Sequence, residues 1–197
     1  MNANSTATNS ASLEIDGKKI DLPIVEGTEK ERAIDIAKLR NETGLITIDP
    51  GFVNTGSCQS AITFIDGEKG ILRYRGYNIE DLAENSSFVE VSYLLINGKL
   101  PNQQELNEFS TGLTRHSLLH EDMSHFFAGF PSNAHPMAIL SAMTTCLSTF
   151  YQSLDDNSDE QINLDIIRIL SKLRTIAAFS YKKSIGQPLI YPENSLS

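Results

Sequence analysis

Apolar and polar positions alternate through much of residues 13–76, and a period of two is typical of strands that bury one face. Two stretches also contain turn signals. Apolar side chains in residues 13–24 lie on both sides of Asp16-Gly17, and residues 62–65 and 71–74 flank a turn that contains Asp66, Gly67 and Gly70. Glycine accepts positive φ at no steric cost, so Asp-Gly between β-formers favours a hairpin. The sequence therefore predicts two β-hairpins.

The segments between these hairpins give two further predictions. Apolar residues within 32–39 allow a short helix, and residues 45–48 are rich in β-branched side chains. They predict a helix and then a strand. Asp49-Pro50-Gly51 follows and ends that strand, because this composition is typical of turns.

The period changes near Tyr77, where apolar residues begin to recur at helical spacing. Ser87 and Glu90 have the spacing of a capping box, which opens a helix, and Gly98 and Pro101 end it. More helices are predicted from Asn102, through 119–130, from Pro136 and over 162–183. The apolar residues expected to face the core from the last helix are Ile166, Ile169, Leu170, Leu173, Ile176 and Ala177.

These elements predict a mainly α protein, a multi-helical domain preceded by a small β-rich segment. Residues 1–12 are rich in Asn, Ser, Thr and Ala and predict a disordered tail that resembles neither a signal nor a transit peptide. Residues 13–76 form the predicted β-rich segment, and residues 77–197 form about five or six packed helices. No apolar run approaches the roughly 18–20 residues that a membrane span needs.

Composition narrows the classes of partner. The chain has 197 residues, a net charge of -9 and a pI of about 4.9. Nucleic acids and anionic membranes would repel such a chain, so neither is an expected partner. Cys58 and Cys146 are too few for a disulfide framework. A reducing cytoplasm is therefore the expected location.

Histidine spacing offers one candidate chemistry. His116 and His120 are four residues apart and could share a helical face, as metal ligands do, and His125 follows. A metal site needs a third ligand and supporting carboxylates at a suitable spacing, and none of the known zinc spacings fits. We therefore favour core or surface histidines and predict no metal site.

Basic residues offer two further candidates. Arg73 and Arg75 are two apart, so a strand would present both on one face, where they could grip an anion or simply be solvated. Arg168 and Lys172 are four apart on the long predicted helix, with Tyr151 on the preceding helix and Arg115 at another helix end. These could form an anion pocket, although ordinary exposed charges explain the same spacing. Composition and spacing alone do not reach a function.

Several longer runs in residues 13–197 resemble the amino-terminal half of bacterial citrate synthases of the long-chain, hexameric type. They occur in family order at family-like spacing. The runs are Asp49-Pro-Gly-Phe52, Ser57-Cys-Gln-Ser60, Ile62-Thr-Phe-Ile-Asp-Gly67, Gly70-Ile-Leu-Arg-Tyr-Arg-Gly-Tyr77, Thr114-Arg-His116, His135-Pro-Met-Ala138, Phe150-Tyr151, Leu170-Ser-Lys172, Tyr181-Lys182, Ser184-Ile-Gly-Gln-Pro188 and Tyr191-Pro192.

The resemblance implies a cytoplasmic homo-oligomer, a dimer or hexamer, of the citric acid cycle. The family is an acyltransferase that condenses oxaloacetate with acetyl-CoA and water to give citrate and CoA, with no cofactor. Its catalytic His and Asp residues lie in the carboxy-terminal half, and their motifs are absent from this sequence. The resemblance therefore assigns no catalytic residue to this chain and predicts an inactive fragment.

One family feature does fall within this chain. Some bacterial members are inhibited by NADH at an allosteric basic pocket, and the residues that resemble that pocket are Arg115, His116, Tyr151, Arg168 and Lys172. Two other readings stay open. One is a 2-methylcitrate synthase fragment, which would use propionyl-CoA, and the other is a truncated, non-enzymatic remnant that acts as a regulatory or interaction module.

Overall fold

The computed structural model describes residues 10–151 and 158–193, and the chain divides into two compact units, Met1–Ser60 and Ala61–Ser197. Most of the described residues in the second unit are helical, and the strands gather in residues 10–78. This arrangement confirms the predicted mainly α fold with a small β-rich amino-terminal segment. Residues 1–9 of the predicted tail lie outside the described residues.

The first unit contains a three-stranded antiparallel sheet of β1 (Ser10–Ile15), β2 (Lys18–Glu26) and β3 (Arg32–Ile34). The first predicted hairpin is confirmed: Asp16 and Gly17 turn the chain at φ of 50° and 79°, and Leu13 pairs with Ile20. Strand β1 already begins at Ser10, because residues 10–12 pair with the backbone of β2. The predicted disordered tail of residues 1–12 therefore extended too far.

Two predictions between the hairpins are wrong. Residues 32–34 pair with β2 as β3, and the helix of this region, α1 (Leu39–Thr43), begins only later. Residues 45–48 form no strand, and the short 3-10 helix η1 (Pro50–Phe52) follows them. A β-prone segment becomes a strand only where a neighbouring strand edge pairs with it, and β2 offers its edge to residues 32–34 instead.

The loop after residue 48 is organised by Asp49. Its carboxylate accepts hydrogen bonds from the Thr55 hydroxyl at 2.5 Å and from the Asn54 N–H at 2.9 Å. The Thr55 hydroxyl, followed by the Asn54 N–H, lowers the pKa of the Asp49 carboxyl because both donors favour its charged form.

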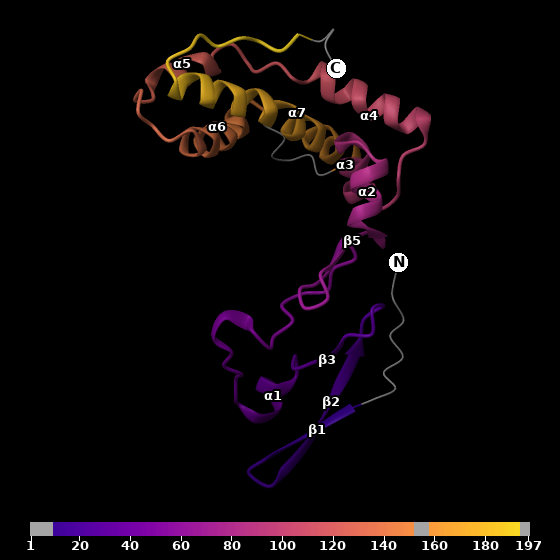
Figure 1. Ribbon diagram of the computed structural model, residues 1–197. Coiled ribbons are helices and arrows are strands. Elements are labelled where there is room, and N and C mark those ends of the chain that lie inside the picture. Colours follow the sequence, from indigo (N-terminus) through magenta and orange to yellow (C-terminus); the bar gives the residue numbers. More distant parts are fainter. Residues whose placement is uncertain (1–9, 152–157, 194–197) are drawn as a thin grey trace. The chain divides into compact units, whose positions relative to one another are not determined.

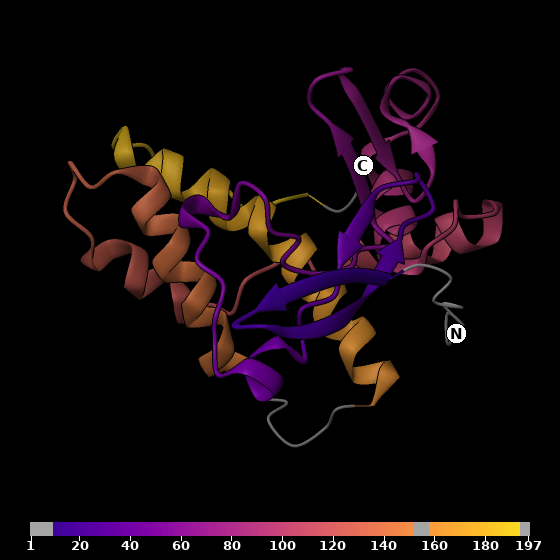
Figure 2. The same ribbon diagram turned by 90° about the horizontal axis from the view of Figure 1, so that it is seen from below.

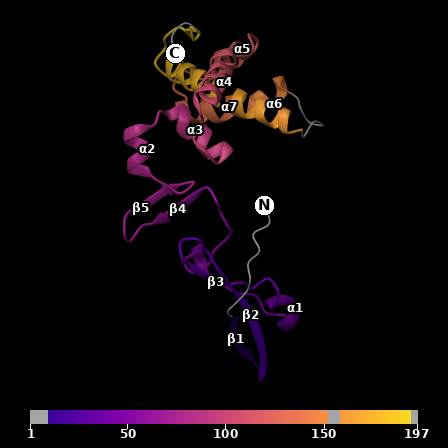
Figure 3. The ribbon, with the colours of Figure 1, turned by 90° about the vertical axis from the view of Figure 1, so that its right-hand side faces the viewer.

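The second unit opens with the other predicted hairpin, which is confirmed. Strands β4 (Thr63–Asp66) and β5 (Ile71–Tyr74) pair antiparallel, and the short β6 (Tyr77–Asn78) pairs with β5. Figure 3 shows this hairpin running into α2 (Ile79–Asn85), with which it shares a unit.

The remaining helices of the second unit are α3 (Phe88–Asn97), α4 (Gln103–Arg115), α5 (Met123–Gly129), α6 (Pro136–Phe150) and α7 (Asp159–Ser184). The longest, α7, packs against α4, α5 and α6, and Figures 1 and 2 show α6 alongside it. The core lies where α5, α6 and α7 meet. Its most buried side chains are Leu119, Met123, Phe127, Ile139, Met143, Leu147, Ile176 and Phe179.

Capping boxes begin α3 and α4. The predicted box at Ser87 is confirmed: the Ser87 hydroxyl accepts the Glu90 N–H, and the Glu90 carboxylate accepts the Ser87 N–H at 2.7 Å. That backbone bond, followed by the bond to the Ser87 side chain, lowers the pKa of the Glu90 carboxyl. Asn102 and Glu105 make an equivalent box at α4. Both helices therefore start at residues that satisfy their free N–H groups.

We expect Ser87→Ala to lower the free energy of unfolding by about 1 kcal/mol, because it removes an N-cap acceptor. Ser92→Ala is the matched control. Ser92 lies in the same helix, and its hydroxyl donates to the Phe88 carbonyl. Substitution of Ser92 removes no N-cap, and alanine has the higher helix propensity. Urea denaturation followed by circular dichroism measures both variants. Equal stability of the two would contradict the capping role.

The buried face of α7 differs from the prediction. Ile176 is buried as expected, but Ile169 is 50% exposed, and Ala177 is also exposed. The side chains that α7 buries besides Ile176 and Phe179 are polar: Ser171, Lys172, Thr175 and Ser180. Ile166, Leu170 and Leu173 are half-buried, so the prediction is right in part. The most deeply buried face is shifted toward the polar residues, whose hydrogen bonds make their burial possible.

Within the described ranges, none of the helices is long and apolar enough to cross a membrane.

Candidate functional site

Tyr151, just past the end of α6, lies against two cations from α7. The Arg168 guanidinium carbon is 5.2 Å from the Tyr151 ring centroid, and the Lys172 ammonium is 4.8 Å from it. Arg168 and Lys172 are one helical turn apart, so both reach the same ring. A cation near an aromatic face is attracted by the ring's quadrupole. The structure thus brings together three of the five predicted pocket residues.

Lys172 is almost completely buried, with 4% of its surface exposed. Its ammonium donates to the His116 carbonyl at 3.0 Å and to the Leu118 carbonyl at 2.5 Å. These carbonyls lie just past the end of α4, where backbone acceptors lack helical partners and the helix dipole is negative. A buried ammonium therefore stabilises the chain where α4 ends.

Two neighbouring side chains on α7 make similar bonds to the same segment. The Ser171 hydroxyl donates to the Leu113 carbonyl, and the Thr175 hydroxyl donates to the Ser117 carbonyl at 2.7 Å. We call Ser171, Lys172 and Thr175 the α7 clasp and residues 113–118 the α4 end. The α7 clasp holds in place the α4 end, the backbone from which Arg115 and His116 project.

His116 is half-buried at the C-cap of α4, and its Nδ1 lies 3.0 Å from the Gly112 carbonyl. Gly112 also allows α4 and α7 to approach closely, because a Cβ there would lie 3.3 Å from Ile167 Cδ1. The close approach brings the α4 end within reach of the α7 clasp.

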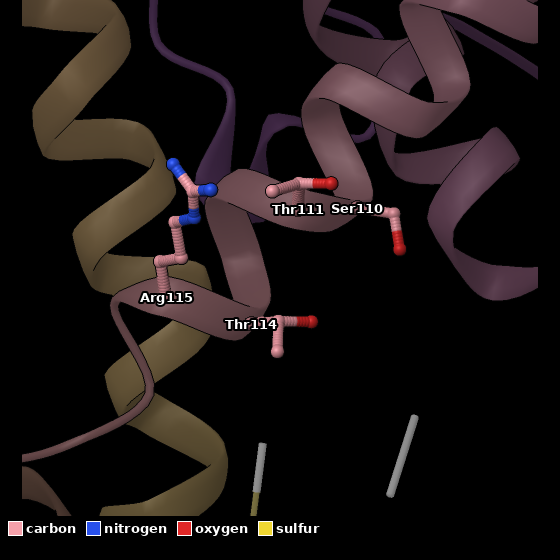
Figure 4. Close-up of a pocket in the computed structure, with 4 residues that line it drawn as sticks. All are labelled: Ser110, Thr111, Thr114 and Arg115. Atoms are coloured by element: carbon pink, nitrogen blue, oxygen red, sulfur yellow. The ribbon is translucent and has the colours of Figure 1, made fainter. Parts of the chain in front are cut away.

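Arg115 is exposed in the last turn of α4 and, with Ser110, Thr111 and Thr114, lines an open hollow of about 360 Å³. Figure 4 shows its guanidinium extending beside α7, away from the hydroxyls of Ser110 and Thr114. Arg168 is partly exposed and pairs with Asp165 at 3.1 Å. Such a partly exposed ion pair contributes little to stability, so the guanidinium can exchange its partner for another anion.

The histidines do not form a metal centre. His120 stacks on Phe150 with ring centroids 4.9 Å apart, His125 is exposed, and His135 caps α6 by accepting the Met137 N–H. In the part of the chain that the structure describes, no group of three or more His, Cys, Asp or Glu residues has the arrangement to hold a metal ion.

The arginines of the second hairpin do not share a strand face. Arg73 lies in β5, where its Nε donates to Asn78 and its guanidinium covers Phe64. Arg75 follows the strand at φ 51°, and its guanidinium donates to the Leu95 carbonyl at 2.7 Å. The prediction of a common face is therefore wrong, because the chain leaves β geometry at Arg75. Arg75 instead links the hairpin to the end of α3.

Comparison with known proteins decides the family. The family model described as "Citrate synthase, C-terminal domain" matches residues 51–197, about three quarters of the chain. The chain belongs to the citrate synthase family. Citrate synthase 1 of Mycobacterium tuberculosis is 52% identical over 188 residues, which cover 95% of this chain and 44% of that protein. The chain thus spans somewhat less than half the length of this citrate synthase.

Solved citrate synthases have the same fold. The citrate synthase from Thermotoga maritima is 33% identical and superposes with a TM-score of 0.65. The match covers 77% of this chain and 39% of the Thermotoga chain. A complex of the Thermoplasma acidophilum citrate synthase with carboxymethyl coenzyme A and oxaloacetate has a TM-score of 0.69. This match covers 75% of our chain and 39% of the Thermoplasma chain. At 22% sequence identity it supports the fold alone.

The sequence predictions missed the polar part of the candidate site. Ser171 and Thr175 were not predicted as site residues, although they flank Lys172 and hold the α4 end. Their spacing of four residues was the available signal, since it places both hydroxyls on one helical face. Nothing in the sequence indicated that the acceptors would be carbonyls more than fifty residues away.

Proposed function

We propose that this chain is the amino-terminal part of a bacterial citrate synthase, which joins acetyl-CoA to oxaloacetate to form citrate and CoA in the cytoplasm. The 52% identity to Citrate synthase 1 over nearly the whole chain is the observation that carries this proposal. The chain itself is expected to supply scaffold and no catalytic group, because the family's catalytic motifs do not occur in its sequence.

The reading frame that encodes this chain tests the proposal. Its complete product, incubated with oxaloacetate and acetyl-CoA, is expected to release CoA thiol and form citrate. Propionyl-CoA in a parallel reaction is expected to react more slowly, and a preference for it would point to 2-methylcitrate instead. Failure to form either product, with a folded protein, would refute the proposed activity.

We also propose that Arg115, His116, Tyr151, Arg168 and Lys172 form an allosteric pocket for NADH. What supports this is the cluster of cations at Tyr151, where the partly exposed Arg168 and the buried Lys172 lie against one aromatic ring. Phosphates of a dinucleotide are suited to guanidinium groups, which bind anions through two parallel hydrogen bonds. The aromatic ring offers a flat surface to a base.

Isothermal titration of NADH into the full-length protein tests the pocket. Arg168→Gln is expected to weaken binding about tenfold, because it removes a charge-assisted contact. Arg174→Gln is the matched control: Arg174 is exposed on the same helix, six residues further along. Unchanged affinity in Arg168→Gln, or no binding to the unaltered protein, would end this proposal.

We further propose that the protein is a homo-oligomer. Large apolar side chains are exposed on helices of the second unit, including Met137 on α6 at 61% and Ile169 on α7 at 50%. Apolar surfaces of this kind are often covered by another subunit. Sedimentation velocity of the full-length protein is expected to show a dimer or a hexamer. A monomer would contradict the proposed oligomer.

A further inference from the structure

We propose that residues 188–192 form a strap, which opens and closes as a unit over the core of the second unit while the helices beneath it stay folded. In the closed state the strap covers the ring of Phe179 on α7. Figure 1 shows the yellow segment that contains the strap running back along α7.

A tight turn at the end of α7 sends the chain back along the helix. Gly186 has a φ of 68°, a left-handed conformation that glycine adopts without steric cost. The Gln187 N–H donates to the Lys182 carbonyl at 2.9 Å, and the Lys182 ammonium donates to the Gln187 side-chain oxygen at 3.1 Å. Gln187 is therefore tied to α7, and the strap begins after it, at Pro188.

Two side chains hold the strap on the core. Leu189 packs against the buried cluster of α5, α6 and α7, and the Tyr191 ring meets that of Phe179 edge to face, with centroids 5.6 Å apart. Phe179 is 2% exposed, and its ring also contacts that of Phe127. Ile190, between the two anchors, is 65% exposed. The strap thus lies with one face on the core and the other in solvent, as an extended segment does.

Backbone hydrogen bonds do not hold the strap. Among the residues that the structure describes, none forms a hydrogen bond with Leu189, Ile190 or Tyr191. Pro188 and Pro192 have no N–H to donate. Opening of the strap therefore breaks only the packing of Leu189 and Tyr191, whereas unfolding of α7 breaks helical hydrogen bonds and the whole core. Segments with so few contacts open at a lower free energy than the protein unfolds.

Opening would uncover apolar surface that the closed strap shields. The Phe179 ring loses its cover when Tyr191 leaves, and the Leu189 side chain enters solvent. Contiguous apolar surface of this kind promotes association with other chains. The closed strap therefore keeps this face of the core from acting as a contact surface.

Native-state proteolysis of the full-length protein tests whether the strap opens alone. Proteinase K is added at increasing urea concentrations below the unfolding transition, and mass spectrometry identifies cleavage within residues 188–192. Because the urea slope of a free energy scales with the surface exposed, the slope for strap cleavage should be less than about a third of that for global unfolding. A slope equal to the global one would overturn the inference, since the strap would then leave only when the core unfolds.

Three variants test the anchor. Tyr191→Ala should raise the rate of strap cleavage about tenfold and increase binding of the dye 8-anilinonaphthalene-1-sulfonate, with an unchanged circular dichroism spectrum. Tyr191→Phe keeps the ring, and Ile190→Ala removes a side chain that faces solvent, so both should behave as the unaltered protein. Each rate is divided by that of the same variant unfolded in urea, which removes the protease's own preference.

Equal cleavage of Tyr191→Ala and Tyr191→Phe would overturn the role of the Tyr191 ring as an anchor of the strap. If Tyr191→Ala does not fold, the urea slope of the unaltered protein decides the proposal by itself.

Discussion

Phe127→Ala is expected to lower the free energy of unfolding by about 3–5 kcal/mol, the largest effect that we predict for a single substitution. Phe127 is 1% exposed on α5, and its ring meets that of Phe179 on α7 edge to face, with centroids 5.5 Å apart. Truncation removes buried apolar surface and leaves a cavity that the surrounding helices can fill only in part. Against a total stability of about 5–15 kcal/mol, the loss is severe.

The neighbouring residue provides the control for this prediction. Phe126 is 52% exposed and touches Phe150 only at a centroid distance of 6.2 Å. Phe126→Ala should cost about 1 kcal/mol or less. Urea denaturation followed by circular dichroism measures both. If the two variants lose equal stability, the core does not lie where α5, α6 and α7 meet.

Ser171→Ala is expected to cost about 1–3 kcal/mol, the usual penalty for removing the partner of a buried polar group. The Ser171 side chain is fully buried and donates to the Leu113 carbonyl in the last turn of α4. Carbonyls in a last helical turn have no partner within the helix, so they depend on groups from outside it.

Ser180→Ala is the matched control, since Ser180 is also buried in α7. Its hydroxyl donates to the Ile176 carbonyl of its own helix at 2.7 Å, and that carbonyl keeps its helical N–H partner after the substitution. Any gain in helix propensity from alanine is the same at both positions. The difference between the two unfolding free energies therefore reports the bond to α4. No difference would show that the α7 clasp adds nothing to stability.

Local signals allowed much of the fold to be predicted. Asp16-Gly17 and the Asp66–Gly70 turn specify hairpins through backbone conformation, and Ser87 with Glu90 specifies a helix start through two reciprocal hydrogen bonds. All of these interactions join residues a few positions apart. Their outcome depends little on the rest of the molecule, so the sequence was sufficient.

Long-range contacts account for the failures. Residues 45–48 have strand propensity but no neighbouring edge, and residues 32–34 became a strand because β2 pairs with them. The buried face of α7 depends on carbonyls at the end of α4. The grouping of Tyr151, Arg168 and Lys172 could be anticipated from the family resemblance, but the burial of Lys172 could not.

The most direct test of the account is the activity of the 197-residue chain alone with oxaloacetate and acetyl-CoA. We regard this chain as citrate synthase scaffold without the family's catalytic residues, so thiol release should not exceed that of a no-protein control. Circular dichroism on the same sample should show helix, so that a lack of activity cannot be attributed to unfolding. Thiol release accompanied by citrate would contradict the account, because it would place catalytic groups within these residues.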